Sequence, residues 1–127
     1  MFVAAGVGIT PFVSMLRYMR DRRESRSVLL AYASRSPADV IFGDELKAIE
    51  AGDFPRLKTI HVLSNAPASW VGETGRLDAD RLARLCGGDE GQAFYLCCPP
   101  PMMAPLIRGL RRMGVSPRRI HTDHFSL

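Results

Sequence analysis

Short apolar segments alternate along this chain with segments of helical periodicity, and this alternation is the feature that most limits the fold. The apolar segments are 1–5, 28–33, 57–64 and 93–97, and a last short strand is expected at 119–123. Between them, apolar residues recur every three or four positions, as Phe12, Leu16 and Met19 do. The βαβαβαβαβ order predicts the α/β class, a three-layer αβα domain with an open parallel sheet of about five strands and helices on both faces. The expected strand order is 3-2-1-4-5.

Two segments carry residues that commonly begin helices. Thr10 is expected to cap a helix through its hydroxyl, with Pro11 at the first helical position. Ser36–Asp39 has the form of a capping box, which predicts a helix as far as about Ala51. That helix is expected to bury three apolar side chains, which are Phe42, Leu46 and Ile49.

The composition narrows the class of protein. A chain of 127 residues, 46% of them hydrophobic, is long enough for one compact core, so we expect a single domain over 1–127. No stretch approaches the ~18 apolar residues that a membrane helix needs, and no signal peptide is expected. The three cysteines lack the spacing of a disulfide framework or a zinc site, so we expect reduced thiols, no metal and a cytoplasmic location.

The net charge of +4 comes largely from two arginine-rich segments, 17–26 and 108–119. Such segments are typical of solvated helix faces and helix ends. They are also compatible with a docking face for an acidic protein partner. Nucleic-acid binding is not expected, because aromatic residues are not interleaved with the arginines and no binding motif is present.

The turn Gly6-Val7-Gly8-Ile9-Thr10-Pro11 joins the first strand to the first helix. Its glycines permit a tight bend and close approach of a ligand to the backbone, and the N–H groups at a helix start favour a phosphate. The pattern is GxGxxP and lacks the third glycine of the usual dinucleotide motif. An ordinary strand-to-helix turn therefore remains an alternative.

The ends of the second and fourth strands offer further candidates. In dinucleotide folds an arginine after the second strand accommodates the 2′-phosphate of NADP, whereas an acid binds the ribose of NAD. Ser34 and Arg35 stand there, which favours NADPH, although Arg35 is also compatible with a solvated loop. Cys97, at the end of the fourth strand, is expected to line the same crevice as Thr10, because ligands lie where the strand order reverses.

Five motifs occur in one order along the chain. They are GVGITPF at 6–12, YASRSPADVIFGDEL at 32–46, GRLD at 75–78, YLCCPPPMM at 95–103 and HTDHF at 121–125. Together they resemble the NAD(P)-binding domain of the ferredoxin–NADP reductase family, which includes flavodoxin reductases and the reductase components of oxygenases. The resemblance covers essentially the whole chain. It implies hydride transfer from NADPH or NADH to an FAD or FMN held by a β-barrel domain, which this chain is expected to lack.

The resemblance also implies roles for individual residues. It places Thr10, Cys97 and Asp123 at the reacting nicotinamide or the flavin, as the catalytic group. The implied cofactor-binding residues are Gly6, Val7, Gly8, Thr10, Pro11, Ser34, Arg35, Cys97, Cys98, Pro99 and Phe125. The implied partners are a flavin-binding domain or subunit and an acidic electron acceptor such as ferredoxin.

One departure from the family pattern bears on activity. The family has Cys-Gly-Pro where this chain has Cys97-Cys98-Pro99. A glycine there indicates a positive φ or close ligand approach, so the added side chain is expected either to be tolerated or to impair access of the nicotinamide. The alternative function is accordingly a non-catalytic nucleotide-binding or protein-docking module, and a third possibility is a piece of a larger reductase.

Overall fold

The protein forms one open sheet with helices on both faces. The structure is a computed structural model, and it describes residues 1–87 and 91–123. Its six strands pair in parallel in the order β4-β3-β2-β1-β5-β6. They are β1 (Phe2–Ala5), β2 (Ser27–Ser34), β3 (Arg56–Leu63), β4 (Glu73–Thr74), β5 (Phe94–Cys97) and β6 (Ile120–Thr122). The predicted order is confirmed, with β4 as an additional two-residue strand at the β3 edge.

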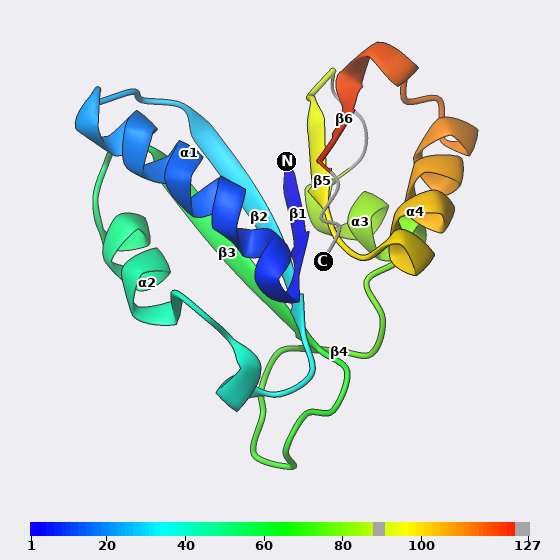
Figure 1. Ribbon diagram of the computed structural model, residues 1–127, viewed down its shortest axis with the longest axis horizontal. Helices are drawn as coiled ribbons and strands as arrows, with labels where there is room; N and C mark the ends of the chain where they lie inside the picture. The colour runs from blue at the N-terminus through cyan, green and yellow to red at the C-terminus, as the bar shows by residue number, and fades with distance from the viewer. Residues whose placement is uncertain (88–90, 124–127) are drawn as a thin grey trace.

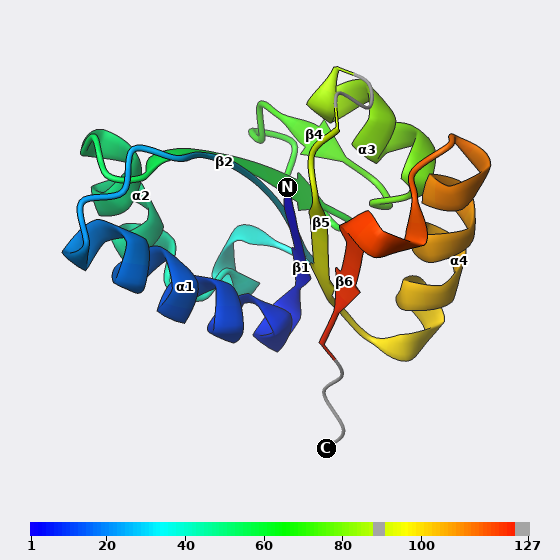
Figure 2. The same ribbon diagram turned by 90° about the horizontal axis from the view of Figure 1, so that it is seen from above.

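Four α-helices cover the sheet in pairs (Figures 1 and 2). The helices α1 (Thr10–Asp21) and α2 (Gly43–Ala51) lie on one face, and α3 (Ala79–Cys86) and α4 (Pro100–Arg112) lie on the other. Along β1, Phe2 and Ala4 pack toward α1 and Val3 packs toward α4, as the alternation of side chains along a strand requires. This alternation creates two apolar cores, one on each side of the sheet.

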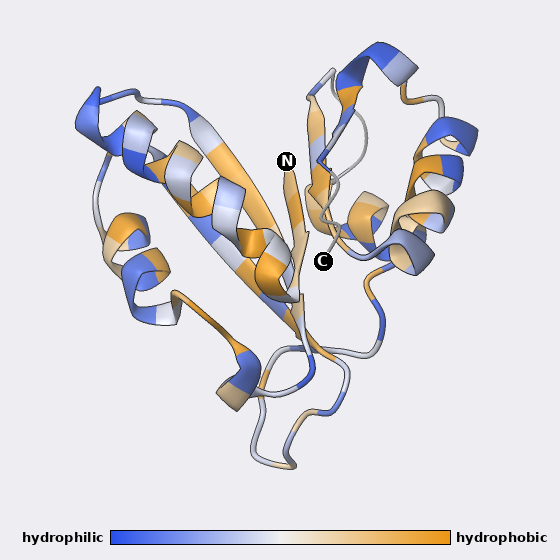
Figure 3. Cartoon of the chain, viewed as in Figure 1, coloured by the Kyte–Doolittle hydropathy of each residue, from blue (hydrophilic) through white to orange (hydrophobic). Residues whose placement is uncertain are grey.

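The apolar residues gather in the strands and on the inner helix faces, while the outer helix faces are hydrophilic (Figure 3). On α1, Phe12, Leu16 and Met19 are buried as the periodicity predicts. Burying one such side chain fully contributes about 1.5–3 kcal/mol, so these helices are held mainly by their inner faces. None of the described helices is long and apolar enough to cross a membrane.

The predicted capping role of Thr10 is wrong. A turn of 3-10 helix over Gly6–Ile9 runs directly into α1, so the Thr10 N–H already donates to the carbonyl of Val7. The Thr10 hydroxyl donates to the same carbonyl over 2.8 Å and caps no amide. Pro11 is the second residue of α1, one position after the predicted first position and still in the first turn.

The single helix predicted from the capping box to Ala51 is also wrong. Pro37–Asp39 forms one 3-10 turn, the chain then extends, and Phe42 adopts a left-handed conformation with φ 59° before α2 begins. The Ser36 hydroxyl donates to the Asp39 carboxylate over 2.7 Å, so it caps no backbone amide. Phe42 is 40% exposed, contrary to prediction, whereas the two other apolar residues predicted for this helix, Leu46 and Ile49, are buried.

Candidate nucleotide-binding site

The turn after β1 packs directly against the end of β5. A Cβ at Gly8 would overlap the carbonyl oxygen of Cys97 and lie 3.4 Å from its Sγ, so glycine is required there by contact. Gly6 has φ +56°, the left-handed conformation that favours glycine, but a Cβ there would meet no neighbour. The two glycines therefore have different structural roles. Gly6 provides the left-handed conformation of the bend, and Gly8 allows the bend to pack against Cys97.

The outer side of this turn is open to solvent. Gly6 and Val7 are exposed, while Ile9 is completely buried and anchors the turn in the core. A helical run leaves the N–H groups of its first turn without acceptors inside the run, and this run begins at Gly6. The amides suited to a phosphate thus lie one turn earlier than the start of α1, where they were predicted.

Cys97 and Asp123 come together at the ends of β5 and β6. The Asp123 N–H donates to the Leu96 carbonyl over 2.9 Å, which fixes the end of β6 beside β5. Cys97 is fully buried, and its burial, together with the negative charge of Asp123, raises the pKa of its thiol. The structure thus brings Gly8, Cys97 and Asp123 into one area, with Thr10 at the exposed start of α1. Phe125 lies outside the described residues.

Cys98, which stands where the family has glycine, does not adopt a left-handed backbone conformation, and its side chain does not lie on the same face of the sheet as that of Cys97. Its side chain packs in the core on the α4 face, with Sγ 3.9 Å from the Met103 sulfur, whereas Cys97 packs in the core on the α1 face. Burial raises the pKa of the Cys98 thiol to about 11, so it is a protonated core residue at neutral pH. The exposed Pro99 follows it and precedes α4.

The end of β2 carries an exposed cation, Arg35, and a buried hydroxyl, Ser34. Arg35 is exposed, and its guanidinium forms no ion pair or hydrogen bond within 1–87 and 91–123. Its backbone is held, because the Asn65 N–H donates to the Arg35 carbonyl over 2.7 Å. The Ser34 hydroxyl oxygen is buried, and it lies beside the Tyr32 hydroxyl. The exposed guanidinium of Arg35 is therefore available to a bound anion, which fits an adenosine 2′-phosphate.

Tyr32 belongs to this region and was missed from the sequence. It is fully buried in β2, and its hydroxyl donates to the Gly6 carbonyl over 3.3 Å and accepts the Ile41 N–H over 3.2 Å. Burial raises the pKa of its hydroxyl. A signal was present: a tyrosine inside an otherwise aliphatic strand requires a partner for its hydroxyl.

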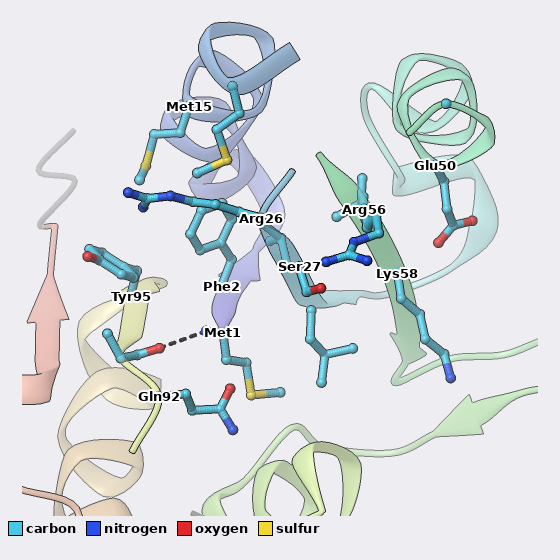
Figure 4. Close-up of a pocket in the computed structure, with 16 residues that line it drawn as sticks. Met1, Phe2, Met15, Arg26, Ser27, Glu50, Arg56, Lys58, Gln92 and Tyr95 are labelled. Atoms are coloured by element: carbon cyan, nitrogen blue, oxygen red, sulfur yellow. Dashed lines mark hydrogen bonds between the residues drawn. The ribbon is translucent and has the colours of Figure 1, made fainter. Parts of the chain in front are cut away.

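A cavity of about 740 Å³ lies at the opposite, amino edge of the sheet (Figure 4). It is lined by the first residues of several strands, including Phe2, Ser27 and Arg56, and by the Met1 amino group, which donates to the Ala93 carbonyl over 2.7 Å. Burial lowers the pKa of that amino group. None of the predicted site residues lines this cavity, so it is separate from the candidate site.

The arginine-rich segments are partly engaged within the protein. Arg17 forms an ion pair with Glu45 at 2.8 Å, Arg22 lies over the ring of Tyr18, and Arg23 lies over that of Phe54. The arginines near the end of α4 are exposed. A docking role for these segments stays a prediction.

Comparison with known proteins gives one consistent family. A family model described as "Oxidoreductase NAD-binding domain" matches residues 2–107. The electron transfer component XylA of the Pseudomonas putida xylene/toluene monooxygenase is 33% identical over 125 residues, which cover 97% of this chain and 35% of that protein. Ferredoxin–NADP reductase B of Sorangium cellulosum is 30% identical over 132 residues, covering 98% of this chain and 53% of the relative.

A solved structure agrees with these relatives. The flavohem-like FAD/NAD binding domain of nitric oxide dioxygenase from Vibrio cholerae matches with a TM-score of 0.84 and 27% identity, over 98% of this chain and 49% of that one. The chain spans about half or less of the length of the relatives it matches. The family model covers most of the chain, and the solved structure shares its fold. The chain therefore belongs to the oxidoreductase NAD-binding domains of ferredoxin–NADP reductase type.

Proposed function

We propose that this chain binds NADPH or NADH across the carboxyl edge of its sheet and presents the nicotinamide to a flavin held by another domain or subunit. The bound nucleotide supplies a hydride, which the flavin accepts for onward electron transfer. The observation that carries the proposal is the glycine turn, which is open to solvent on its outer side and packed against Cys97 on its inner side.

The residues divide by the part of the nucleotide that they would hold. The backbone amides of Gly6, Val7 and Gly8, at the start of a helical run, bind the pyrophosphate, with Gly6 and Val7 exposed and Gly8 packed against Cys97. A second group would form the wall at the nicotinamide and at the flavin beyond it, and its members are Thr10, Pro11, Cys97, Pro99 and Asp123. The cofactor contacts implied for Cys98 and Phe125 stay predictions, because the Cys98 side chain packs in the core on the α4 face and Phe125 lies outside the described residues. The chain's contribution is to orient the ring and exclude water.

Cys97 acts in this scheme as a positioning residue and not as a nucleophile. Its thiol is buried and its raised pKa keeps it protonated at neutral pH, while a nucleophilic cysteine requires a thiolate. The placement of Cys98 in the opposite core removes the observation that favoured a non-catalytic module. We therefore prefer the reductase function.

NADPH is the preferred nucleotide in this proposal. Arg35 supplies an exposed guanidinium where an adenosine 2′-phosphate would lie, Ser34 precedes it, and no acid intervenes between them and Asp39. A relative of 30% identity is named for NADP, which agrees with this preference.

The partner in this proposal is a flavin-binding domain or subunit, with residues 1–127 as the NAD(P)-binding domain. The Vibrio cholerae relative is named for both FAD and NAD, and this chain covers 49% of it. The exposed arginines of α4 fit an acidic electron acceptor such as ferredoxin, and the thiols, which form no disulfide, fit a cytoplasmic location.

The Arg35→Ala variant tests the nucleotide assignment. A charged hydrogen bond contributes about 1.5–3 kcal/mol, so affinity for NADP⁺ should fall roughly tenfold or more. Affinity for NAD⁺ should not change, because it lacks the 2′-phosphate. Both can be measured by calorimetric titration, with Arg111→Ala on the exposed end of α4 as the matched control. Equal loss for the two nucleotides would refute the 2′-phosphate role.

A further inference from the structure

The Tyr32 hydroxyl joins two segments that the proposed function assigns to different ends of the nucleotide. The hydroxyl donates a hydrogen bond to the Gly6 carbonyl, in the turn proposed to bind the pyrophosphate. The hydroxyl also accepts a hydrogen bond from the Ile41 N–H, near the end of the loop that begins with Arg35. The donor and the acceptor capacities of one buried hydroxyl are thus both used, one on each segment.

The loop that carries Arg35 is also fixed at its start. The Ser64 N–H donates to the Ser34 carbonyl over 3.0 Å, and the Asn65 N–H donates to the Arg35 carbonyl over 2.7 Å, so β3 holds the loop where it leaves β2. The bond from Ile41 to Tyr32 fixes the loop where it returns. Among the described residues, the Tyr32 hydroxyl is the direct side-chain link between this loop and the glycine turn.

We propose that Tyr32 is a positioning residue that sets the spacing between the pyrophosphate turn and the 2′-phosphate loop, so that both are in place before NADP(H) binds. This inference rests on the proposed function. A ligand that spans both segments gains from a preset spacing, because the chain then loses less freedom on binding. A ligand that touches one segment alone gains nothing from it.

The Tyr32→Phe variant, which keeps the ring and removes the hydroxyl, tests this role. One neutral hydrogen bond corresponds to about a fivefold change in affinity, so the dissociation constant for NADP⁺ should rise about fivefold. The dissociation constant for adenosine 2′-monophosphate, which reaches only the Arg35 loop, should not change. The matched control is Tyr18→Phe, since Tyr18 is 58% exposed and its ring lies under Arg22. The control should leave both constants unchanged.

The outcomes separate the two proposals. Unchanged NADP⁺ binding by Tyr32→Phe, or equal loss for NADP⁺ and the fragment, overturns the positioning role while the proposed function stands. Failure of the unmodified chain to bind either compound overturns the proposed function, and the positioning role with it.

A second measurement needs no variant. In the unmodified chain without nucleotide, the Ile41 amide should exchange with deuterium far more slowly than an unstructured amide, because its bond to Tyr32 is already formed. Exchange of the Ile41 amide at the unstructured rate, with protection only after NADP⁺ is added, would overturn the preset spacing.

Discussion

At the scale of single residues, the site depends on contacts that leave no room for a side chain. Gly8 lies against the Cys97 carbonyl, and Gly6 adopts a conformation that disfavours other residues. The sequence singled out both glycines, because a strand-to-helix turn with two glycines is a local pattern. It could not show which of the two is required by contact, since that contact joins residues far apart in the chain.

Gly8→Ala should lower both stability and NADP⁺ affinity. The added methyl group would overlap backbone that cannot move aside, and such overpacking costs about 1–3 kcal/mol. Gly87→Ala is the matched control, because Gly87 is also strained for alanine at φ +72° but a Cβ there meets no neighbour. Urea unfolding should show destabilisation of both variants, whereas titration with NADP⁺ should show loss only for Gly8→Ala. Normal binding by Gly8→Ala would contradict the contact's role.

His61 gives the stability a pH dependence. Burial lowers its pKa below the ordinary 6.5, and its buried Nδ1 has no hydrogen-bond partner in the described part of the chain. Above 6.5 the histidine is neutral in both folded and unfolded chains, and as pH falls the unfolded chain takes up the proton first, so stability is lost on acidification. Urea unfolding between about pH 7.5 and 5.5 should show this loss, and His61→Asn should reduce it. An equal loss in both proteins would contradict the assignment.

At the scale of elements, sequence periodicity predicted the strands and the apolar helix faces well. It failed where a tertiary contact competes with a local one. The segment 36–42 has the form of a helix start, yet the Ile41 N–H bonds to the Tyr32 hydroxyl and the Ser36 hydroxyl bonds to Asp39. Local pattern could not predict the first of these bonds, because it joins the loop to β2, whereas the second is itself local. The same limit applies to Thr10, which follows a turn that is already helical.

The packing of α3 on α4 depends on Gly109. A Cβ there would overlap the Cβ of Ala79, so the helices meet through a glycine–alanine contact. Alanine has a helix propensity about 1 kcal/mol better than glycine, but overpacking costs about 1–3 kcal/mol, so Gly109→Ala should destabilise the domain. Adding Ala79→Gly should recover part of the loss, which thermal unfolding can measure. A gain in stability from Gly109→Ala alone would contradict this contact.

At the scale of the whole molecule, the family model confirms the family that the five sequence motifs suggested, and the fold matches a solved structure with a TM-score of 0.84. The sheet brings the carboxyl ends of β1, β2, β5 and β6 to one edge, so residues from four distant segments reach that edge. The domain is proposed to bind the nicotinamide nucleotide, and the proposed hydride transfer also requires a flavin ring held by another domain or subunit.

The chain alone should therefore bind NADP⁺ but not oxidise NADPH with ferricyanide as acceptor. Joined at its amino end to a flavin-binding barrel of reductase type, it should oxidise NADPH, because the two rings then share one site. The joined protein carrying Gly8→Ala is the control and should be slow. The loss of NADPH absorbance reports the rate. Steady turnover by the isolated chain would contradict the proposal that the flavin must come from another domain or subunit.

The most direct measurement is titration of the ¹⁵N-labelled chain with NADP⁺, followed through its amide resonances. If the turn after β1 binds the pyrophosphate, the amide resonances of Gly6, Val7 and Gly8 should shift strongly and reach saturation. The amide resonances of residues around Arg35 should shift with them. Saturation of binding elsewhere, with the amides of this turn unmoved, would contradict the account.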